Sequence, residues 1–428
     1  MKRKIIVLMI VMAVAGAAQA ATELQKQAAI DAGLAWLANP AQQQADGHWE
    51  YGNAGSDIAA TGAALLAFIE EGHTPTSATA YSTNVQNGLN YLLNNARTYQ
   101  PPSGPTVGVK FGDDQWNDGR DIYATGLALP AIAKLAVSSP GTVLTTGPQA
   151  GSTYAQLVQG VVDYLEFAQN DPATGNNRGG WRYYANYGNS DNSTAQWPPI
   201  GMLYAQTVPG VSVSTSVKDE LAYWIEYSQD GTGVYDGAAR YDTGTTWYNQ
   251  SKTGGLLVQM AFAENDTASQ AYNISHPDVL AAIGYLDRTW DNGISPSFYW
   301  SDQDNIGNPY AMWSVYKGLE AMIGLSGNLD AYITPGPQGG AVIDGDGPGP
   351  MVDDVWNWWE EYCDWIVADQ SGGYWSGYAN WTGPLATAWY INILAATEVP
   401  VIPVPGAFLL GSIGLAFACR KLQRRKEL

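Results

Sequence analysis

The stretch GLAWLANPAQQQADGHWEY, residues 33–51, contains the pattern that decides the fold. An apolar helical turn with the pair Trp36-Leu37 is followed by three glutamines, an Asp-Gly dipeptide and the aromatic residues Trp49 and Tyr51. Glycine accepts the left-handed backbone that ends many helices, and a glutamine side chain can bond the unpaired backbone groups nearby. The stretch therefore predicts a helix end followed by a loop that is fixed to a neighbouring element.

The same pattern recurs along the chain. An aromatic residue followed by Leu or Ile lies in an apolar helical segment six times, at Trp36, Tyr91, Tyr164, Trp224, Tyr285 and Trp365. After each comes a polar, Gly-rich stretch with an aromatic, and then a second apolar segment. We expect these second segments to be helices over 59–69, 122–136, 194–206, 251–263, 309–323 and 385–396. The sequence therefore predicts an all-α chain of about six helical hairpins.

Six such hairpins have to bury two apolar helix faces each, which one hairpin cannot do alone. An open solenoid needs polar terminal repeats, whereas the first and last units here read like the middle ones. We therefore expect the hairpins to close into an α/α toroid, with an open solenoid as the alternative. In either arrangement Trp36, Tyr164 and Trp365 are predicted to pack between repeats.

These units resemble the QW repeats of squalene cyclase-type terpenoid cyclases and of protein prenyltransferase toroids. The best copies are GLAWLANPAQQQADGHW, at 33–49, and VVDYLEFAQNDPATGNNRGGW, at 161–181, and the resemblance covers about residues 25–397. It implies the toroid fold. It does not carry the activity, because the catalytic motifs of both families are altered.

Squalene-type cyclases protonate an alkene with an Asp-x-Asp-Asp-Thr-Ala motif, whereas the matching stretch here is SDNSTA, residues 190–195. Ser190, Asn192 and Ser193 occupy the three acidic positions, and Asp191 is one place out of register. Prenyltransferases bind zinc through Cys, Asp and His, but Cys363 lies in an outer helical segment, and the chain has only three histidines. We expect no metal and no cofactor, and whether the chain is an enzyme stays open.

Both ends of the chain carry export signals. Residues 1–20, MKRKIIVLMIVMAVAGAAQA, have a basic start, a short apolar run and an A-x-A site, which predicts a signal peptide cut by signal peptidase after Ala20. An uncleaved anchor is the alternative. The tail IPVPGAFLLGSIGLAFACRKLQRRK resembles the PEP-CTERM signal read by exosortases, although Val404 stands where Glu is commonest.

Pro403 and Pro405 break any helix before a short apolar segment, which a basic cluster beginning at Arg420 follows. We expect an exosortase-like protease to cut this tail, residues 399–428, while it holds the precursor in the membrane. A plain membrane anchor is the alternative. The mature protein would then reach the cell surface or extracellular matrix as a single repeat domain, residues 21–398, with a Gly/Pro-rich insertion at about 326–352.

The charge of the repeat domain limits its partners. Three of the 20 basic residues lie in the signal and five in the tail, so 21–398 keeps 12 basic against 39 acidic residues, a net charge of −27. Such a surface repels nucleic acid and anionic lipid. We therefore expect no nucleic-acid partner, and a ligand that is an exopolysaccharide or an apolar molecule.

In a toroid the N-termini of the inner helices converge on one mouth of the ring, so the residues that lead into those helices are candidates for a ligand site. They are Asp57, Thr61, Arg120, Asp121, Asp191, Trp197, Asp242, Trp247, Asp304, Trp313, Trp381 and Tyr390. For each Asp or Thr the alternative is a helix N-cap. We predict a binding scaffold with an aromatic, acidic cavity for a glycan or other uncharged ligand. A polysaccharide hydrolase or lyase and a divergent terpenoid cyclase are the alternatives.

Overall fold

The computed structural model describes residues 20–51, 57–112, 120–290, 305–325, 357–398 and 400. The signal peptide except Ala20, the insertion at about 326–352, and Asp304, Pro403, Pro405 and Arg420 lie outside these ranges. The predictions made for those residues therefore remain predictions.

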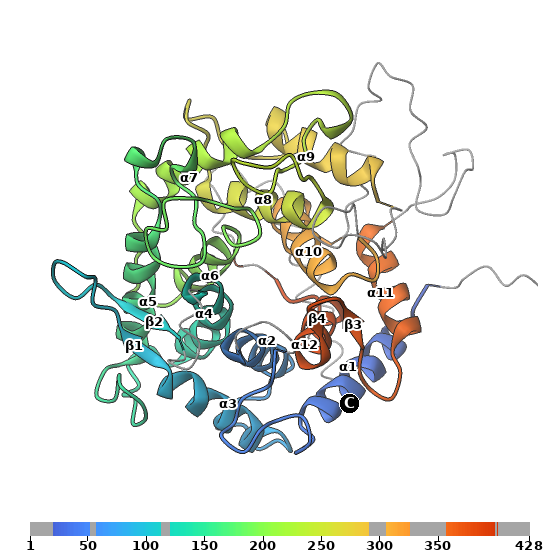
Figure 1. The fold of residues 1–428 in the computed structure, drawn as a ribbon. Coiled ribbons are helices and arrows are strands. Elements are labelled where there is room, and N and C mark those ends of the chain that lie inside the picture. The colour runs from blue at the N-terminus through green and yellow to red at the C-terminus, as the bar shows by residue number, and fades with distance from the viewer. Residues whose placement is uncertain are drawn as a thin grey trace, which may run out of the picture.

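The described chain is built from helices that alternate between an outer and an inner layer (Figure 1). The outer helices are α1 (Glu23–Leu37), α3 (Ser82–Asn94), α5 (Tyr154–Ala168), α7 (Thr215–Ser228), α9 (Pro277–Arg288) and α11 (Trp358–Asp369). The inner helices are α2 (Asp57–Glu70), α4 (Asp121–Ser138), α6 (Trp197–Ala205), α8 (Gln250–Ala263), α10 (Pro309–Ile323) and α12 (Gly383–Leu394). All six aromatic-Leu or aromatic-Ile pairs fall in outer helices, and the all-α prediction is confirmed.

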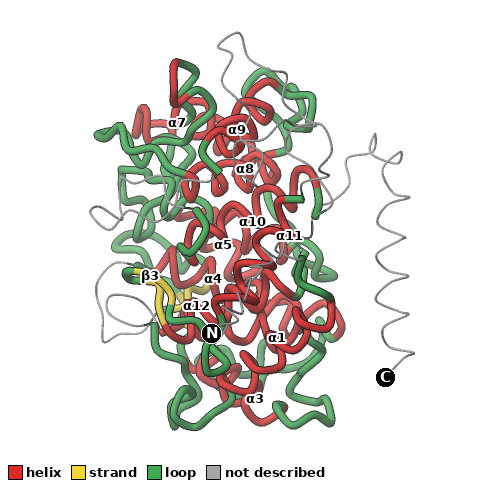
Figure 2. The backbone as a smooth tube through the Cα atoms, turned by 90° about the vertical axis from the view of Figure 1, so that its right-hand side faces the viewer, coloured by secondary structure: helices red, strands yellow, loops and turns green. Residues whose placement is uncertain are grey.

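Each inner helix contacts the next along the chain, and α12 contacts α2, while the outer helix α1 contacts α11 and α12. The strands are short: β1 (Ala96–Thr98) pairs with β2 (Val109–Phe111), and β3 (Gly377–Tyr378) with β4 (Trp381–Thr382). Figure 2 shows that helices fill the depth of the molecule and that long loops lie at its edges. None of the described helices combines the length and apolar character needed to cross a bilayer.

A glutamine in the loop after an outer helix joins each of four repeats to the next outer helix. Gln43 donates from Nε2 to the carbonyl of Gly47 in its own loop (2.9 Å) and to that of Asn84 in α3 (2.9 Å). Gln169 donates in the same way to Gly179 (2.8 Å) and Val217 (2.9 Å). We call this double hydrogen bond the glutamine staple.

One further staple and one single contact of the same kind extend the pattern. Gln229 donates to the carbonyls of Gly237 (3.1 Å) and Asp278 in α9 (2.9 Å). Gln370, after the last outer helix, donates to the carbonyl of Ala29 in α1 (2.8 Å). The contact that joins neighbouring repeats therefore also joins the last repeat to the first. The sequence predicted bonds from these glutamines to carbonyls of the last helical turn and to amides of the next helix. The observed acceptors are carbonyls of the glutamine's own loop and of the next outer helix.

A glycine in each stapled loop lies against the neighbouring outer helix. The helix residue that it contacts is three positions after the residue that accepts the staple's hydrogen bond. Gly47 has a φ of 101°, and a Cβ there would lie 2.2 Å from the carbonyl oxygen of Asn87. Gly179 and Gly237 have φ values of 82° and 87°, and a Cβ would lie 1.8 Å from the Glu220 oxygen and 1.9 Å from the Ala281 oxygen. Only glycine lets the loop backbone lie this close to the next helix.

The tryptophan of the repeat fills the space behind the staple. Trp49, Trp181 and Trp375 are fully buried. Their indole N–H groups donate to the carbonyls of Leu37 (2.8 Å), Leu165 (2.8 Å) and Ile366 (2.7 Å), each at the end of the preceding outer helix. Of the three aromatics predicted to pack between repeats, Tyr164 is fully buried, and Trp36, half-buried, stacks on Tyr374 with ring centroids 4.7 Å apart. Trp365 is half-buried beside Tyr390.

Buried threonines fix the same loops to the inner helices. The hydroxyl oxygens of Thr61, Thr125, Thr253 and Thr387 accept the backbone N–H groups of Trp49 (3.1 Å), Phe111 (3.0 Å), Ala239 (3.1 Å) and Trp375 (3.3 Å). In three copies a glycine follows. At Gly62, Gly126 and Gly254 a Cβ would lie within 2.7 Å of backbone atoms of the adjacent inner helix. The Thr-Gly dipeptides therefore allow the inner helices to pack closely.

We expect Gly47→Ala to destabilise the protein much more than Gly72→Ala. Both glycines have positive φ, 101° and 85°, but a Cβ at Gly72 meets no atom within 4 Å. The Gly72 variant therefore measures backbone strain alone, about 1 kcal/mol, whereas Gly47→Ala also forces α3 away from its loop. Urea unfolding of both variants measures the difference. Equal losses of stability would show that the close approach at Gly47 does not stabilise the fold.

Candidate functional site

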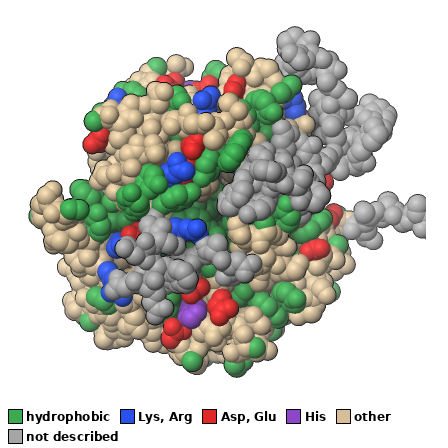
Figure 3. All heavy atoms as spheres, in the orientation of Figure 1, with side chains coloured by type: hydrophobic (Ala, Val, Ile, Leu, Met, Phe, Trp, Pro, Cys, Tyr) green, Lys and Arg blue, Asp and Glu red, His purple; other side chains and the backbone are tan. Residues whose placement is uncertain are grey.

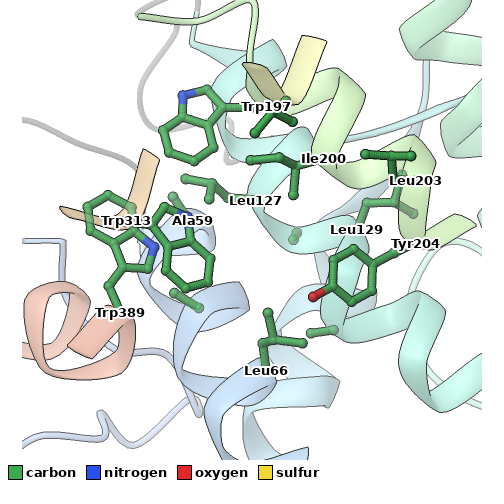
Figure 4. Packing of buried hydrophobic residues seen from close by; sticks show 14 of the residues in the cluster. Ala59, Leu66, Leu127, Leu129, Trp197, Ile200, Leu203, Tyr204, Trp313 and Trp389 are labelled. Atoms are coloured by element: carbon green, nitrogen blue, oxygen red, sulfur yellow. The ribbon is translucent and has the colours of Figure 1, made fainter. Parts of the chain in front are cut away.

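Three parallel tryptophan rings lie along the inside of the helix ring. Trp389 of α12 stacks between Trp197 of α6 (centroids 5.9 Å apart, planes 9° apart) and Trp313 of α10 (6.1 Å, 10°). Figure 4 shows them pointing into the same interior space as Leu66 of α2 and Leu127 of α4. At most 3% of each indole is exposed. Side chains therefore fill the interior at this level, and Trp197 and Trp313, predicted to face a cavity, are core residues.

A pocket opens above this stack, where the inner helices begin. Its lining consists of Ser193, Tyr241, Asn249, Ser251, Lys252, Asn308, Tyr310 and Trp381. Asn249 and Asn308 cap α8 and α10 by accepting backbone N–H groups of the first turn. In the view of Figure 3 hydrophobic side chains gather around a hollow near the centre of this face, with Lys or Arg side chains among them. The pocket thus combines aromatic, hydroxyl and amide groups with the ammonium group of Lys252.

Tyr310 forms the floor of the pocket. Its ring stacks on Trp381 (4.6 Å between centroids, 16° between planes) and contacts Trp197 below. Its hydroxyl donates to the carbonyl oxygen of Ser193 (2.9 Å) and accepts from Nε2 of Gln196 (2.7 Å). Burial raises the pKa of Tyr310 well above its usual value, so the phenol stays neutral. The stack is therefore continuous from the pocket into the core.

One arginine holds two carboxylates beside the pocket. The guanidinium of Arg182 lies 3.1 Å from Oδ2 of Asp191, which is fully buried, and 3.4 Å from Oδ2 of Asp242. Asp191 also accepts hydrogen bonds from the Ser193 hydroxyl (2.6 Å) and the Thr194 amide (2.8 Å). Burial raises the pKa of Asp191 although Arg182 and these donors lower it. Ser193 connects this cluster to the pocket lining.

At the opposite end of the inner helices, the segment that follows α12 is bound by side chains of α6 and α10. Lys317 of α10 is fully buried, and its ammonium donates to the carbonyl of Thr397 (2.5 Å), which also accepts the Tyr316 hydroxyl (3.0 Å). The Tyr204 hydroxyl of α6 donates to the carbonyl of Glu398 (2.8 Å). We call this arrangement the exit clamp. Seven residues separate Tyr310 in the pocket from Lys317, about 10 Å along the helix.

The exit clamp predicts an unusual dependence of stability on pH. Burial lowers the pKa of Lys317 to about 8, and the nearby acidic Glu320 and Glu70 oppose the shift. Because the folded pKa lies below the unfolded value of about 10.4, the unfolded state binds more protons between these values, and this lysine raises the free energy of unfolding as pH rises through them. We expect Lys317→Met to abolish that rise and to leave stability at pH 7 unchanged or higher.

Chemical denaturation between pH 7 and 10.5 measures this effect. Lys218→Met is the matched control, because Lys218 is paired with Glu264 in a half-buried ion pair away from the exit clamp. The control should keep the same dependence on pH as the wild type. A Lys317→Met variant that also keeps it would contradict the assignment of the shift to Lys317.

The structure brings some of the predicted site residues together and separates others. Asp191, Asp242 and Trp381 meet around the pocket, with Trp197 beneath it. Trp247 is 39% exposed, 5.8 Å from the ring of Tyr241. The remaining described candidates do not line the pocket and make pairs or packing contacts of their own: Asp57, Thr61, Arg120, Asp121, Trp313 and Tyr390.

Individual contacts explain these positions. Asp57 accepts the backbone N–H of Tyr51 (3.0 Å), so it fixes the loop before α2. Asp121 pairs with Lys110 of β2 (2.5 Å). Burial raises the pKa of Tyr51 to about 12, and Arg120, which precedes α4, opposes this shift. Tyr390 is fully buried between Trp365 and Trp375, in the layer between inner and outer helices.

Several pocket residues were missing from the sequence prediction. Tyr241, Asn249, Asn308 and Tyr310 lie in segments that the repeat pattern indicated, YDTGTTWYNQ and DQDNIGNPYAMW, but the acidic residues and tryptophans there were chosen instead. Arg182 directly follows Trp181, the tryptophan of its repeat. The sequence does not show that Arg182 lies beside both Asp191 and Asp242, because only folding of the loops brings the three residues together.

No protein-family model, characterised protein or solved structure matches this chain. Within the described ranges, His, Cys, Asp and Glu side chains form no group of three that could hold a metal ion. Cys363 is buried in α11, and burial raises the pKa of its thiol, which disfavours the thiolate that metal binding or nucleophilic attack requires.

Proposed function

We propose that this chain is an exported α/α-toroid protein whose mouth pocket binds a carbohydrate. The staple pattern and the contact between the last and first repeats support the toroid class. The two terminal signals in the sequence support export, sorting at the C-terminal tail and a place at the cell surface. The pocket supports the ligand class, because sugars bind where an aromatic ring meets several hydroxyl and amide groups.

The lining of the pocket carries the ligand assignment. Trp381 and Tyr310 supply the aromatic surface, while Ser193, Ser251 and Tyr241 supply hydroxyl groups. These groups can accept and donate hydrogen bonds with sugar hydroxyls, and the ammonium of Lys252 is a further donor. A terpene cyclase needs an open apolar interior for a long polyprene, whereas the tryptophan stack fills the interior directly below the pocket. Binding at the mouth is therefore favoured over chemistry in the interior.

We expect Trp381→Ala to weaken glycan binding about tenfold, because loss of an aromatic stack costs about 1 kcal/mol or somewhat more. The ligand is first found by screening the mature protein on a glycan array, and isothermal titration calorimetry then measures the affinity. Tyr223→Ala is the control, since Tyr223 is an exposed aromatic on the outer helix α7. If circular dichroism shows that both variants are folded and Trp381→Ala binds the glycan as tightly as the wild type, this pocket is not the binding site.

A second candidate function, cleavage of a polysaccharide, is favoured by the cluster around Arg182. Asp191 and Asp242 share one guanidinium, which keeps their carboxylates no further apart than the roughly 10 Å that glycosidases use. A buried carboxyl group with a raised pKa is suited to donate a proton to a leaving oxygen. The Tyr241 hydroxyl, bonded to that of Tyr183 (3.1 Å), lies beside the same cluster.

If the chain cleaves its glycan, Asp242→Asn should lower the rate at which new reducing ends or unsaturated ends form by at least about a hundredfold. Asp219→Asn, on the exposed face of α7, is the control and should leave the rate unchanged. Ligand bound by the wild type without release of any product would exclude this second function and leave the binding function standing.

A further inference from the structure

The chain position directly before α1 lies against the last outer helix. The backbone N–H of Ala21 donates to Oδ1 of Asp364, a half-buried residue of α11. Thr22 is the N-cap of α1 and forms a capping box with Gln25, so the helix start is fixed just after this position. The first residues of the described chain are therefore held at the seam between α1 and α11.

Charges from both helices surround this position. Lys26 of α1 is buried, donates to Glu360 of α11 and lies 3.3 Å from Glu23. Its ammonium also lies 4.3 Å from the ring centroid of Trp359. Glu360 therefore has a cationic partner in α1. Asp364 receives a hydrogen bond from an uncharged backbone amide as long as Ala20 precedes it in the chain.

We propose that the bond between Ala20 and Ala21 is the processing site and that its hydrolysis completes the seam with an ion pair. Water adds to the Ala20 carbonyl and the peptide bond breaks, which leaves a carboxylate on Ala20 and an α-ammonium on Ala21. That ammonium already lies at Oδ1 of Asp364. Removal of the leader therefore converts an amide hydrogen bond into a charge-assisted one, which is roughly twice as strong. The contact between the start of α1 and α11 is therefore stronger in the processed chain than in the precursor.

The local backbone suits this cleavage. Ala20 is exposed, and Thr22 is extended, with φ −66° and ψ 154°, so the bond to be cut lies outside helix α1. Ala18 and Ala20, three residues and one residue before this bond, match the A-x-A rule of signal peptidases. The proposal depends on export of the chain but not on the ligand of the pocket.

Four proteins test the proposal, each ending at Leu428 and purified in mild detergent. Two begin at Ala21, produced by removing a fusion partner that leaves no extra residue, and two carry Gly-Ser before Ala21, which moves the ammonium away. One of each pair carries Asp364→Asn. With Asp364 present, we expect the protein that begins at Ala21 to have a melting temperature about 1–3 °C higher than the protein with Gly-Ser before Ala21. The two proteins that carry Asp364→Asn should have the same melting temperature.

The difference should also depend on pH. An α-amino group has an unfolded pKa of about 7.7–8.0, and pairing with a carboxylate raises the folded value. The added stability is therefore fully present below about pH 7.5 and is lost as pH rises through the folded pKa. Lys26, Glu23, Glu360 and Asp364 are common to both starts, so their own titration cancels in the difference.

Each outcome decides the proposal. A higher melting temperature that needs both the free Ala21 amine and Asp364, and that is lost at alkaline pH, supports it. Equal melting temperatures of the two starts, or a difference that persists with Asp364→Asn, would overturn it. N-terminal sequencing of protein exported from the full chain should begin at Ala21, and a different first residue would also overturn it. None of these results depends on glycan binding, which the Trp381→Ala variant tests separately.

Discussion

The glutamine staple is the interaction on which the arrangement of the repeats depends. One side chain bonds a carbonyl in its own loop and a carbonyl of the next outer helix, so it fixes both the end of one hairpin and the position of the following one. A loop glycine then lies against the same helix three residues further on, where a Cβ would overlap with backbone atoms. Because Gln370 makes the same contact to α1, no repeat has to act as a special cap.

The close packing that these glycines permit also determines where a ligand can bind. Glycines at the contacts between inner helices bring the helix axes together, and the side chains that point inward are large. Three stacked indoles and the tyrosines above and below them fill the interior, so polar groups gather at the ends of the inner helices instead. At one end they form a pocket lined by hydroxyl and amide groups, and at the other they bind the chain's own carbonyls.

The sequence predicts the repeats well because each one repeats the same local chemistry. The aromatic-Leu pairs mark the outer helices, and the Gln and Gly residues between them mark the staples. The inner surface was harder to predict, because the aromatic residues that pack the interior and those that line the pocket have the same composition. Trp313 and Trp381 read alike in the sequence, yet one is in the stack and the other in the pocket. Likewise Thr61 looked like a rim residue, but its hydroxyl binds the loop amide of Trp49.

The exit clamp has a mechanical consequence. Thr397 and Glu398 are bound by side chains of two inner helices, α6 and α10, so a force applied to the chain beyond residue 400 enters the molecule near the ring axis. Such a force is shared between the two inner helices that flank α8 and does not act on one hairpin alone. If the chain is attached through its tail, the pocket at the other end of the inner helices faces away from the attachment.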